Sequence, residues 1–101
     1  PPMLNTPEGK AGASYRLYRT SFTPRKNLAD GTGRIHFYKI IGKAEIWLNG
    51  VLIGKKDSFA PAELDLQLPA GEGVRQLNVI VQGDGDNKAG VEGNVVIEPK
   101  K

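Results

Sequence analysis

The 101-residue sequence contains no cysteine, and it has a single histidine, His36, and a single tryptophan, Trp47. Without thiols, both a disulfide framework and a metal site of thiolates are excluded. A metal centre or a catalytic triad would have to be built around one imidazole. The spacings of a nucleophile elbow, a phosphate-binding loop and a zinc finger are missing too, so these common site types find no support in the sequence.

Long hydrophobic runs are also lacking. No stretch of about 18 apolar residues is present that could span a membrane as a helix. The first ten residues, PPMLNTPEGK, contain no apolar signal core, and position 1 is not methionine. From these features we expect a domain excised from a longer protein.

Neither sign of charge is in large excess. The sequence has 14 Lys and Arg residues against 11 Asp and Glu residues, a net charge of +3. The charges are dispersed, and no five or six like charges follow one another. We therefore expect neither nucleic acid nor a membrane surface as a partner. A chain of this length forms one domain and can bury a core without cross-links.

The clearest local signal is the stretch AEIWLNGVLIG, Ala44–Gly54. Asn49-Gly50 between two apolar runs predicts a β-hairpin, because its tight turn needs positive φ at both central residues. This register places Leu48 opposite Val51, and opposed residues share a face of the ribbon. One face is then wholly apolar and the other holds the tryptophan. The first face consists of Ile46, Leu48, Val51 and Ile53, and the second of Glu45, Trp47, Leu52 and Gly54.

Five further stretches are rich in β-branched and aromatic residues or alternate apolar with polar positions. They are Tyr15–Thr23, Gly33–Ile41, Glu63–Leu68, Arg75–Gln82 and Val91–Glu98. No window shows helical periodicity, so short strands separated by glycine and proline turns predict an all-β sandwich or barrel. We expect a linker or loosely docked leading segment over 1–14, a β-sandwich domain over 15–98 and a tail over 99–101.

Five pieces between Leu17 and Gln82 follow one another in a recognisable order. They are Tyr18-Arg19 with Phe22 and Pro24; Gly33-Arg34-Ile35 with Phe37; Ala44–Gly50 with Ile53-Gly54; Asp57-Ser58 with Pro61 and Glu63–Leu66; and Gly71 with Leu77-Asn78-Val79 and Val81. In this order they resemble the jelly-roll domain, also called sugar-binding or galactose-binding-like, of glycoside hydrolase family 2. The resemblance implies an antiparallel β-sandwich of jelly-roll type. The segment DSFAPAELDL, Asp57–Leu66, is most similar to the β-galactosidase branch of that family.

The departures from this family indicate the kind of domain. The catalytic glutamates of the family lie on a separate (β/α)₈ barrel, which has no counterpart in this sequence. In the galactosidase domain, the stretch after the last matching strand carries a tryptophan, whereas residues 83–90 here have no aromatic residue. The resemblance therefore implies a non-catalytic accessory domain without a cofactor. We expect it to pack against other domains of a parent hydrolase, itself periplasmic or secreted, and to bind oligo- or polysaccharide weakly.

Candidate carbohydrate contacts are Trp47, Tyr38, His36, Asp57 and Ser58. An indole can stack on the apolar face of a sugar while its N–H binds a hydroxyl. Tyr38 and His36 are on the polar face of their predicted strand, and Asp57 and Ser58 belong to a loop of the kind that carries sites in sandwiches. For Trp47 we favour the competing interpretation, packing beneath a neighbouring segment.

Acidic residues raise two more hypotheses. Glu63 and Asp65 share a face of one predicted strand, as a glycosidase pair would. We interpret both as solvated surface acids, and His36 as an ordinary half-exposed residue. Asp84, Asp86 and Asn87 offer oxygen ligands for a structural calcium ion, but without the spacing of an EF-hand we favour a solvated turn.

The alternative function is a stand-alone β-barrel that binds nucleic acid or another polymer through basic and aromatic side chains. Its surface would be formed by Arg16, Tyr18, Arg19, Arg34, His36 and Tyr38. The mild charge and the family resemblance argue against this alternative.

Overall fold

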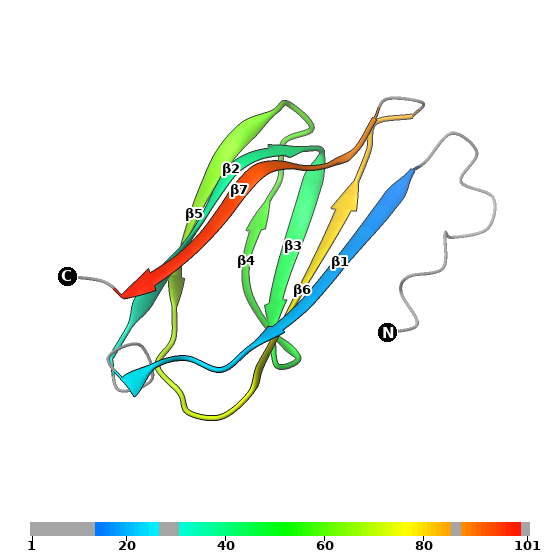
Figure 1. Ribbon diagram of the computed structural model, residues 1–101. Coiled ribbons are helices and arrows are strands. Elements are labelled where there is room, and N and C mark those ends of the chain that lie inside the picture. The colour runs from blue at the N-terminus through cyan, green and yellow to red at the C-terminus, as the bar shows by residue number, and fades with distance from the viewer. Residues whose placement is uncertain (1–13, 27–30, 86–87, 100–101) are drawn as a thin grey trace.

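The structure is a computed structural model, and it describes residues 14–26, 31–85 and 88–99 (Figure 1). Seven strands are formed by these residues: β1 (Tyr15–Phe22), β2 (Gly33–Ile41), β3 (Lys43–Leu48), β4 (Val51–Lys56), β5 (Ala62–Leu68), β6 (Arg75–Gln82) and β7 (Gly90–Pro99). Neighbouring strands pair antiparallel in two sheets, ordered β1-β6-β3-β4 and β5-β2-β7. The expected antiparallel β-sandwich is confirmed. Within the described ranges, no helix has the length and apolar character needed to cross a membrane.

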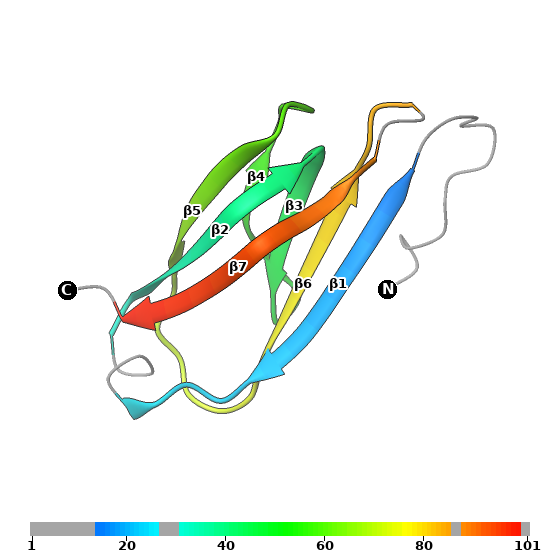
Figure 2. The ribbon, with the colours of Figure 1, turned by 45° about the horizontal axis from the view of Figure 1, so that its top comes forward.

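The chain passes from one sheet to the other at every connection between described strands except the β3–β4 hairpin. The two sheets face each other so that β4 lies against β5 and β6 lies against β7. Strand β1 is at the free edge of its sheet, beside β6 (Figure 2). Consequently none of the seven described strands lies opposite β1.

The core is formed by the inward faces of both sheets. Alternation in β2 is as expected, because Ile35 and Phe37 are 0% and 1% exposed while Tyr38 is 54% exposed. From the other sheet, Leu77 and Val79 of β6 and Ile46 of β3 pack against them. Burying aliphatic and aromatic side chains of this size is the main stabilising term in a domain of about 100 residues.

The β3–β4 hairpin turns at Asn49-Gly50 as predicted, with φ values of 48° and 82°. Leu48 lies opposite Val51 and Trp47 opposite Leu52. The predicted register is wrong beyond that point, because Ile46 lies opposite Gly54 instead of Ile53. Ile53 is the extra residue of a β-bulge. The predicted apolar face is partly wrong too, because Val51 at the tip is 63% exposed, although Ile53 still packs against the core.

The bulge reverses the faces of every residue that follows it in β4. Gly54 points to the core side, where a Cβ atom would meet the side chain of Leu66. Lys55 lies opposite Glu45 and Lys56 opposite Ala44, a core residue. In the straight register Lys55 would have faced the core and Lys56 the solvent. Strand β4 thus extends beyond the predicted hairpin stretch Ala44–Gly54, as far as Lys56.

Lys56 is 7% exposed, and its ammonium group binds backbone carbonyls at one end of the sandwich. Nζ donates to the carbonyl oxygens of Gly42 at 2.9 Å, Ser58 at 2.5 Å and Ala60 at 2.6 Å. Three acceptors match the three N–H donors of an ammonium, whereas a neutral amine has two. Desolvation by burial lowers the pKa of Lys56. This side chain thus fixes the β2–β3 corner and the loop after β4 to each other.

Replacing Asn49 tests how the hairpin is attached to β6. The Asn49 N–H donates to the Gln76 carbonyl at 2.8 Å, and its Oδ1 accepts from the Gln76 N–H at 2.6 Å. Asn49→Ala loses the side-chain bond and places alanine at positive φ, which together cost about 1–2 kcal/mol. Asn49→Gly keeps the backbone geometry and should lose about half as much. Urea unfolding measures both; equal costs for the two variants would contradict this division.

Candidate functional site

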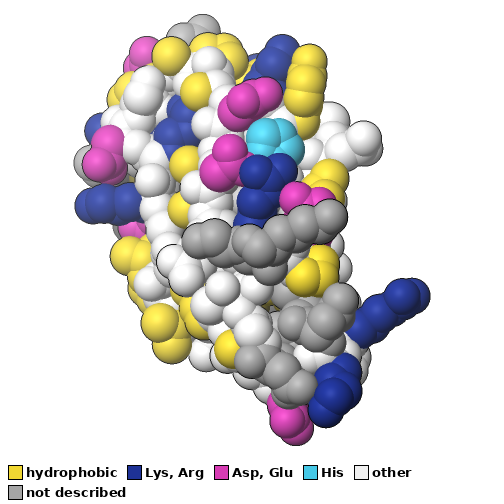
Figure 3. Space-filling view, turned by 90° about the vertical axis from the view of Figure 1, so that its left-hand side faces the viewer, with side chains coloured by type: hydrophobic (Ala, Val, Ile, Leu, Met, Phe, Trp, Pro, Cys, Tyr) yellow, Lys and Arg dark blue, Asp and Glu magenta, His cyan; other side chains and the backbone are white. Residues whose placement is uncertain are grey.

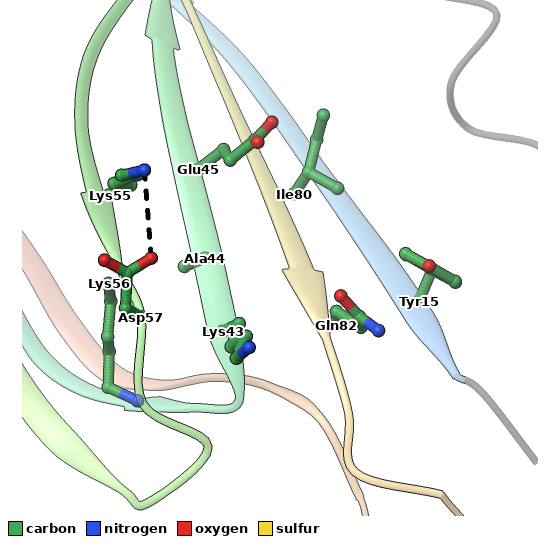
Figure 4. Close-up of a pocket in the computed structure, with 9 residues that line it drawn as sticks. All are labelled: Tyr15, Lys43, Ala44, Glu45, Lys55, Lys56, Asp57, Ile80 and Gln82. Atoms are coloured by element: carbon green, nitrogen blue, oxygen red, sulfur yellow. Dashed lines mark ion pairs between the residues drawn. The ribbon is translucent and has the colours of Figure 1, made fainter.

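A shallow hollow of about 360 Å³ opens on the outer face of the β1-β6-β3-β4 sheet (Figure 4). Most of its lining residues belong to two rows of paired residues that run across the sheet from strand to strand. In the first row Tyr15 lies opposite Gln82, and Gln82 lies opposite Lys43. The second row runs from Ile80 of β6 through Glu45 of β3 to Lys55 of β4. The lining is completed by Ala44, Lys56 and Asp57.

Charges of both signs surround the hollow. Lys55 Nζ lies 3.9 Å from Asp57 Oδ1, and both side chains are exposed, so this pair is screened and weak. Lys43 Nζ lies 4.8 Å from the centre of the Phe59 ring, a cation–π contact that holds it at the rim. The hollow therefore offers ammonium, carboxylate and amide groups that can exchange hydrogen bonds with a polyhydroxylated ligand.

Trp47 lies on the same outer face, one row beyond the hollow. It is opposite both Asn78 and Leu52, and its Nε1–H donates to Glu45 Oε1 at 3.2 Å. Arg19 completes this row, where its Nε–H donates to Asn78 Oδ1 at 3.0 Å. The indole is half-buried on this exposed sheet face, and it positions a carboxylate that lines the hollow.

The predicted carbohydrate contacts do not form one site. Trp47 and Asp57 belong to the face just described, whereas His36 and Tyr38 lie on the outer face of the β5-β2-β7 sheet, on the opposite side of the sandwich. Ser58 follows Asp57 but does not line the hollow; its Oγ accepts a hydrogen bond from the Ala60 N–H at 3.0 Å. Alternation within one strand does not reveal which sheet the strand joins, so the sequence could not show this division.

On the opposite face, His36 belongs to a row of polar and charged side chains that crosses the sheet. Its Nδ1 lies 2.7 Å from Asp65 Oδ1, and Arg34 connects Asp65 (3.6 Å) with Glu98 (2.9 Å). Figure 3 shows this histidine beside basic and acidic side chains. Both acids of the predicted pair are exposed on β5: Asp65 is part of this row, and Glu63 lies at the start of the strand.

Of the three candidate calcium ligands, the structure describes Asp84. Asp84 lines a groove at one end of the sandwich with Phe59, Pro61 and Lys88. Asp86 and Asn87 lie outside the described residues. Among the residues that are described, no group of three or more His, Cys, Asp or Glu side chains is arranged to hold a metal ion. The calcium hypothesis stays a prediction.

The six residues considered for nucleic-acid binding do not lie on one surface either. Arg16 and Tyr18 point inward from β1 because they lie opposite the core residues Val81 and Val79. Arg19 points outward from that sheet, and Arg34, with His36 and Tyr38, belongs to the other sheet. Strand alternation and the two-sheet arrangement thus prevent these six residues from sharing one face.

Several residues of the hollow were not singled out from the sequence. Tyr15, Lys43, Glu45, Lys55 and Gln82 come from four strands. For Glu45 the sequence did contain a signal, because alternation places it on the same face as Trp47. Lys55 lies on this face only because of the bulge in β4. Tyr15 and Gln82 come together only through the pairing of β1 with β6, which the local sequence does not show.

The fold and this open hollow define a small β-sandwich domain with a polar surface site. No family model matches the chain, and no curated protein matches it. Among solved structures, the β-glucuronidase of Bifidobacterium dentium, determined in complex with coumarin-3-O-glucuronide, is similar at 27% sequence identity and a TM-score of 0.52. The match covers 67% of this chain and 11% of the β-glucuronidase chain. This similarity supports a domain like those of glycoside hydrolase family 2, without specifying a branch.

Proposed function

We propose that this chain is a non-catalytic accessory β-sandwich domain of a family 2 glycoside hydrolase. In this role it packs against other domains of its parent protein and holds carbohydrate weakly at the hollow lined by Tyr15, Glu45 and Asp57. The observation that carries the proposal is the similarity to a β-glucuronidase of which the matched part is only 11%. A segment of that size is a small part of the hydrolase to which it is similar.

The chemistry of the hollow supports the carbohydrate part of the proposal. Hydroxyl groups of a sugar both donate and accept, and the hollow presents the Glu45 and Asp57 carboxylates as acceptors and the Lys43 and Lys55 ammonium groups as donors. Tyr15 supplies an aromatic ring at the rim, and such rings stack on the apolar face of a sugar. The hollow is shallow and open, so we expect a dissociation constant of about 1–10 mM.

The β-galactosidase branch is the finer part of the proposal, and it rests on the resemblance of Asp57–Leu66 to that branch. The two lysines of the hollow favour a different sugar, because an ammonium group pairs with the carboxylate of a uronic acid. The β-glucuronidase similarity is in line with this second option. Methyl β-galactoside and methyl β-glucuronide are therefore the two probes to compare.

The test is an NMR titration of the whole 101-residue chain with each glycoside. We expect shift changes at Tyr15, Glu45 and Gln82 that saturate at millimolar glycoside. Tyr15→Ala should weaken binding about fivefold, because it removes the ring without opening the core. Tyr38→Ala is the matched control, since Tyr38 is exposed on the opposite face and should leave the titration unchanged.

Three outcomes separate the parts of the proposal. Shift changes centred on His36 and Tyr38 would move the sugar site to the other sheet. No saturable change with either glycoside would leave only the packing role. Turnover of a chromogenic galactoside or glucuronide by this chain alone, abolished by Glu45→Gln, would contradict a non-catalytic domain.

A further inference from the structure

One side of the sandwich is open along its length. A sheet of four strands faces a sheet of three, and β4 over β5 and β6 over β7 are the facing pairs. The remaining strand, β1, has no described strand opposite it, and the free edge of β7 borders the vacant position (Figure 2). One more strand beside β7 would complete a sandwich of two four-stranded sheets.

Several inward-pointing side chains along this side are exposed. Val95 of β7 lies opposite Phe37 and so points to the core side, yet it is 41% exposed. Tyr18 of β1 lies opposite Val79 and is 36% exposed. Phe37 and Val79 themselves are almost fully buried. A contiguous group of exposed apolar side chains is typical of a surface that a partner covers.

A groove of about 410 Å³ occupies the vacant position. Core side chains form its floor, namely those of Phe37, Leu77 and Val79, and Val91 and Val95 form one wall. Near Val91 the Tyr18 hydroxyl joins the two sheets by accepting a hydrogen bond from the Val91 N–H at 3.0 Å. The groove is thus bounded by a polar bridge and is mostly apolar, although Arg19 and Thr20 of β1 also belong to its lining.

The walls of the groove are the unpaired edges of two strands. Among the described strands, β7 pairs only with β2 and β1 pairs only with β6. Apart from the Val91 N–H, which donates to the Tyr18 hydroxyl, these edges present backbone N–H and C=O groups that an added strand can pair with. We propose that an extended polypeptide segment adds to β7 as a further strand and places aliphatic side chains, at alternate positions, on the floor of the groove.

A charge just beyond the groove, on the same face of β1 as Tyr18, specifies the segment further. Arg16 points inward from β1, opposite Val81, and it is exposed. Within the described part of the chain, Arg16 has no ion-pair partner. The added strand therefore carries an acidic residue at the end that lies beside Arg16. The partner is an extended peptide segment with alternating aliphatic residues and one terminal acidic residue.

A synthetic peptide of this chemistry tests the inference. The probe is about seven residues long, alternates Val and Thr, and ends in Glu. Titrated into the isotopically labelled 101-residue chain, it should shift the methyl signals of Val91 and Val95 and the ring signals of Tyr18. Binding with a dissociation constant of about 0.1–1 mM is expected. A control peptide of the same composition, with its valines consecutive, should bind at least about tenfold more weakly.

Two neighbouring residues of β7 give matched variants. Val95 and Val96 are 41% and 40% exposed, but Val95 faces the groove and Val96 lies opposite His36 on the other face of the sheet. Val95→Glu should weaken peptide binding at least about tenfold, because it places a carboxylate on the apolar groove. Val96→Glu should leave binding within about twofold. Circular dichroism of both variants verifies that the sandwich is intact.

Other occupants would give different results. Equal weakening by both variants, or shifts at Val51 and Leu52 of β4, at the opposite edge of the β1-β6-β3-β4 sheet from β1, would overturn the proposal. Dimerisation of the chain that Val95→Glu abolishes would mean that a second copy fills the groove. Peptide binding only after removal of residues 1–13 would assign the groove to the chain itself. Either of these two results would overturn the partner stated here.

Discussion

Lys56→Met is expected to lower the free energy of unfolding by about 3–4 kcal/mol. Methionine matches the aliphatic stem of lysine but has no donor, so the carbonyls of Gly42, Ser58 and Ala60 lose their partner together. Leaving a buried acceptor without a hydrogen bond costs about 1–3 kcal/mol. Partial access of water to the Ser58 and Ala60 carbonyls keeps the sum below three full penalties. Urea unfolding of the variant measures the loss.

Lys55→Met is the control for this prediction. Lys55 is adjacent in sequence, but it is exposed and contacts Asp57 at 3.9 Å on the surface. An exposed pair of this kind contributes little, so the control should cost less than about 0.5 kcal/mol. Equal losses for the two variants would mean that Lys56 contributes only as a charge and does not hold the three carbonyls.

The pH dependence of Lys56→Met has a definite sign. Because burial lowers the pKa of Lys56 below 10.5, the unfolded chain binds more protons than the folded chain between the two pKa values. The stability of the native sequence should therefore rise with pH across that window, relative to the variant. Unfolding free energies of both proteins, measured from neutral to alkaline pH, give the difference. A difference that falls across the window would contradict the direction of the shift.

Gly54→Val is expected to destabilise the domain by about 2–3 kcal/mol. The bulge turns Gly54 toward β5, and a side chain there would overlap the Leu66 methyl groups. Overpacking of a filled interior costs about this much because backbone and side chains must shift. Thermal unfolding should show the loss as a lower midpoint, by about 4–8 °C for each kcal/mol in a domain of this size.

A double mutant separates overpacking from other effects of the valine. Leu66→Ala alone removes a half-buried side chain and is itself destabilising. In the pair Gly54→Val with Leu66→Ala, the alanine makes room for the valine. The double variant should therefore be at least about 1 kcal/mol more stable than the sum of the single effects predicts. Additive losses would show that the introduced valine does not meet Leu66.

Local sequence was sufficient to predict the hairpin turn but not the register beyond it. The backbone conformation of the turn follows from Asn49 and Gly50 alone, because both residues tolerate positive φ. The bulge at Ile53 depends on contacts with distant residues. Leu66 leaves room only for a glycine at position 54, and the carbonyls that Lys56 binds belong to two other segments. The apolar pattern alone favours the straight register, since it cannot show those contacts.

The same reasoning applies to the candidate site. Alternation predicts correctly that Trp47 shares a face with Glu45 and that His36 shares one with Tyr38. It does not say which strands are neighbours, so Trp47 and His36 could not be assigned to different sheets. The pairing of β6 with both β1 and β3, which assembles the hollow, joins segments that are far apart in the sequence.

The order of the strands has a consequence for synthesis on the ribosome. Strand β2 is central in its sheet, between β5 and β7, although it is the second strand made and β7 is the last. Until Gly90–Pro99 leaves the exit tunnel, one edge of β2 and the apolar side chain of Phe37 remain uncovered by β7. A nascent chain in this state is prone to aggregate. We expect the domain to complete its folding only after synthesis has passed Pro99.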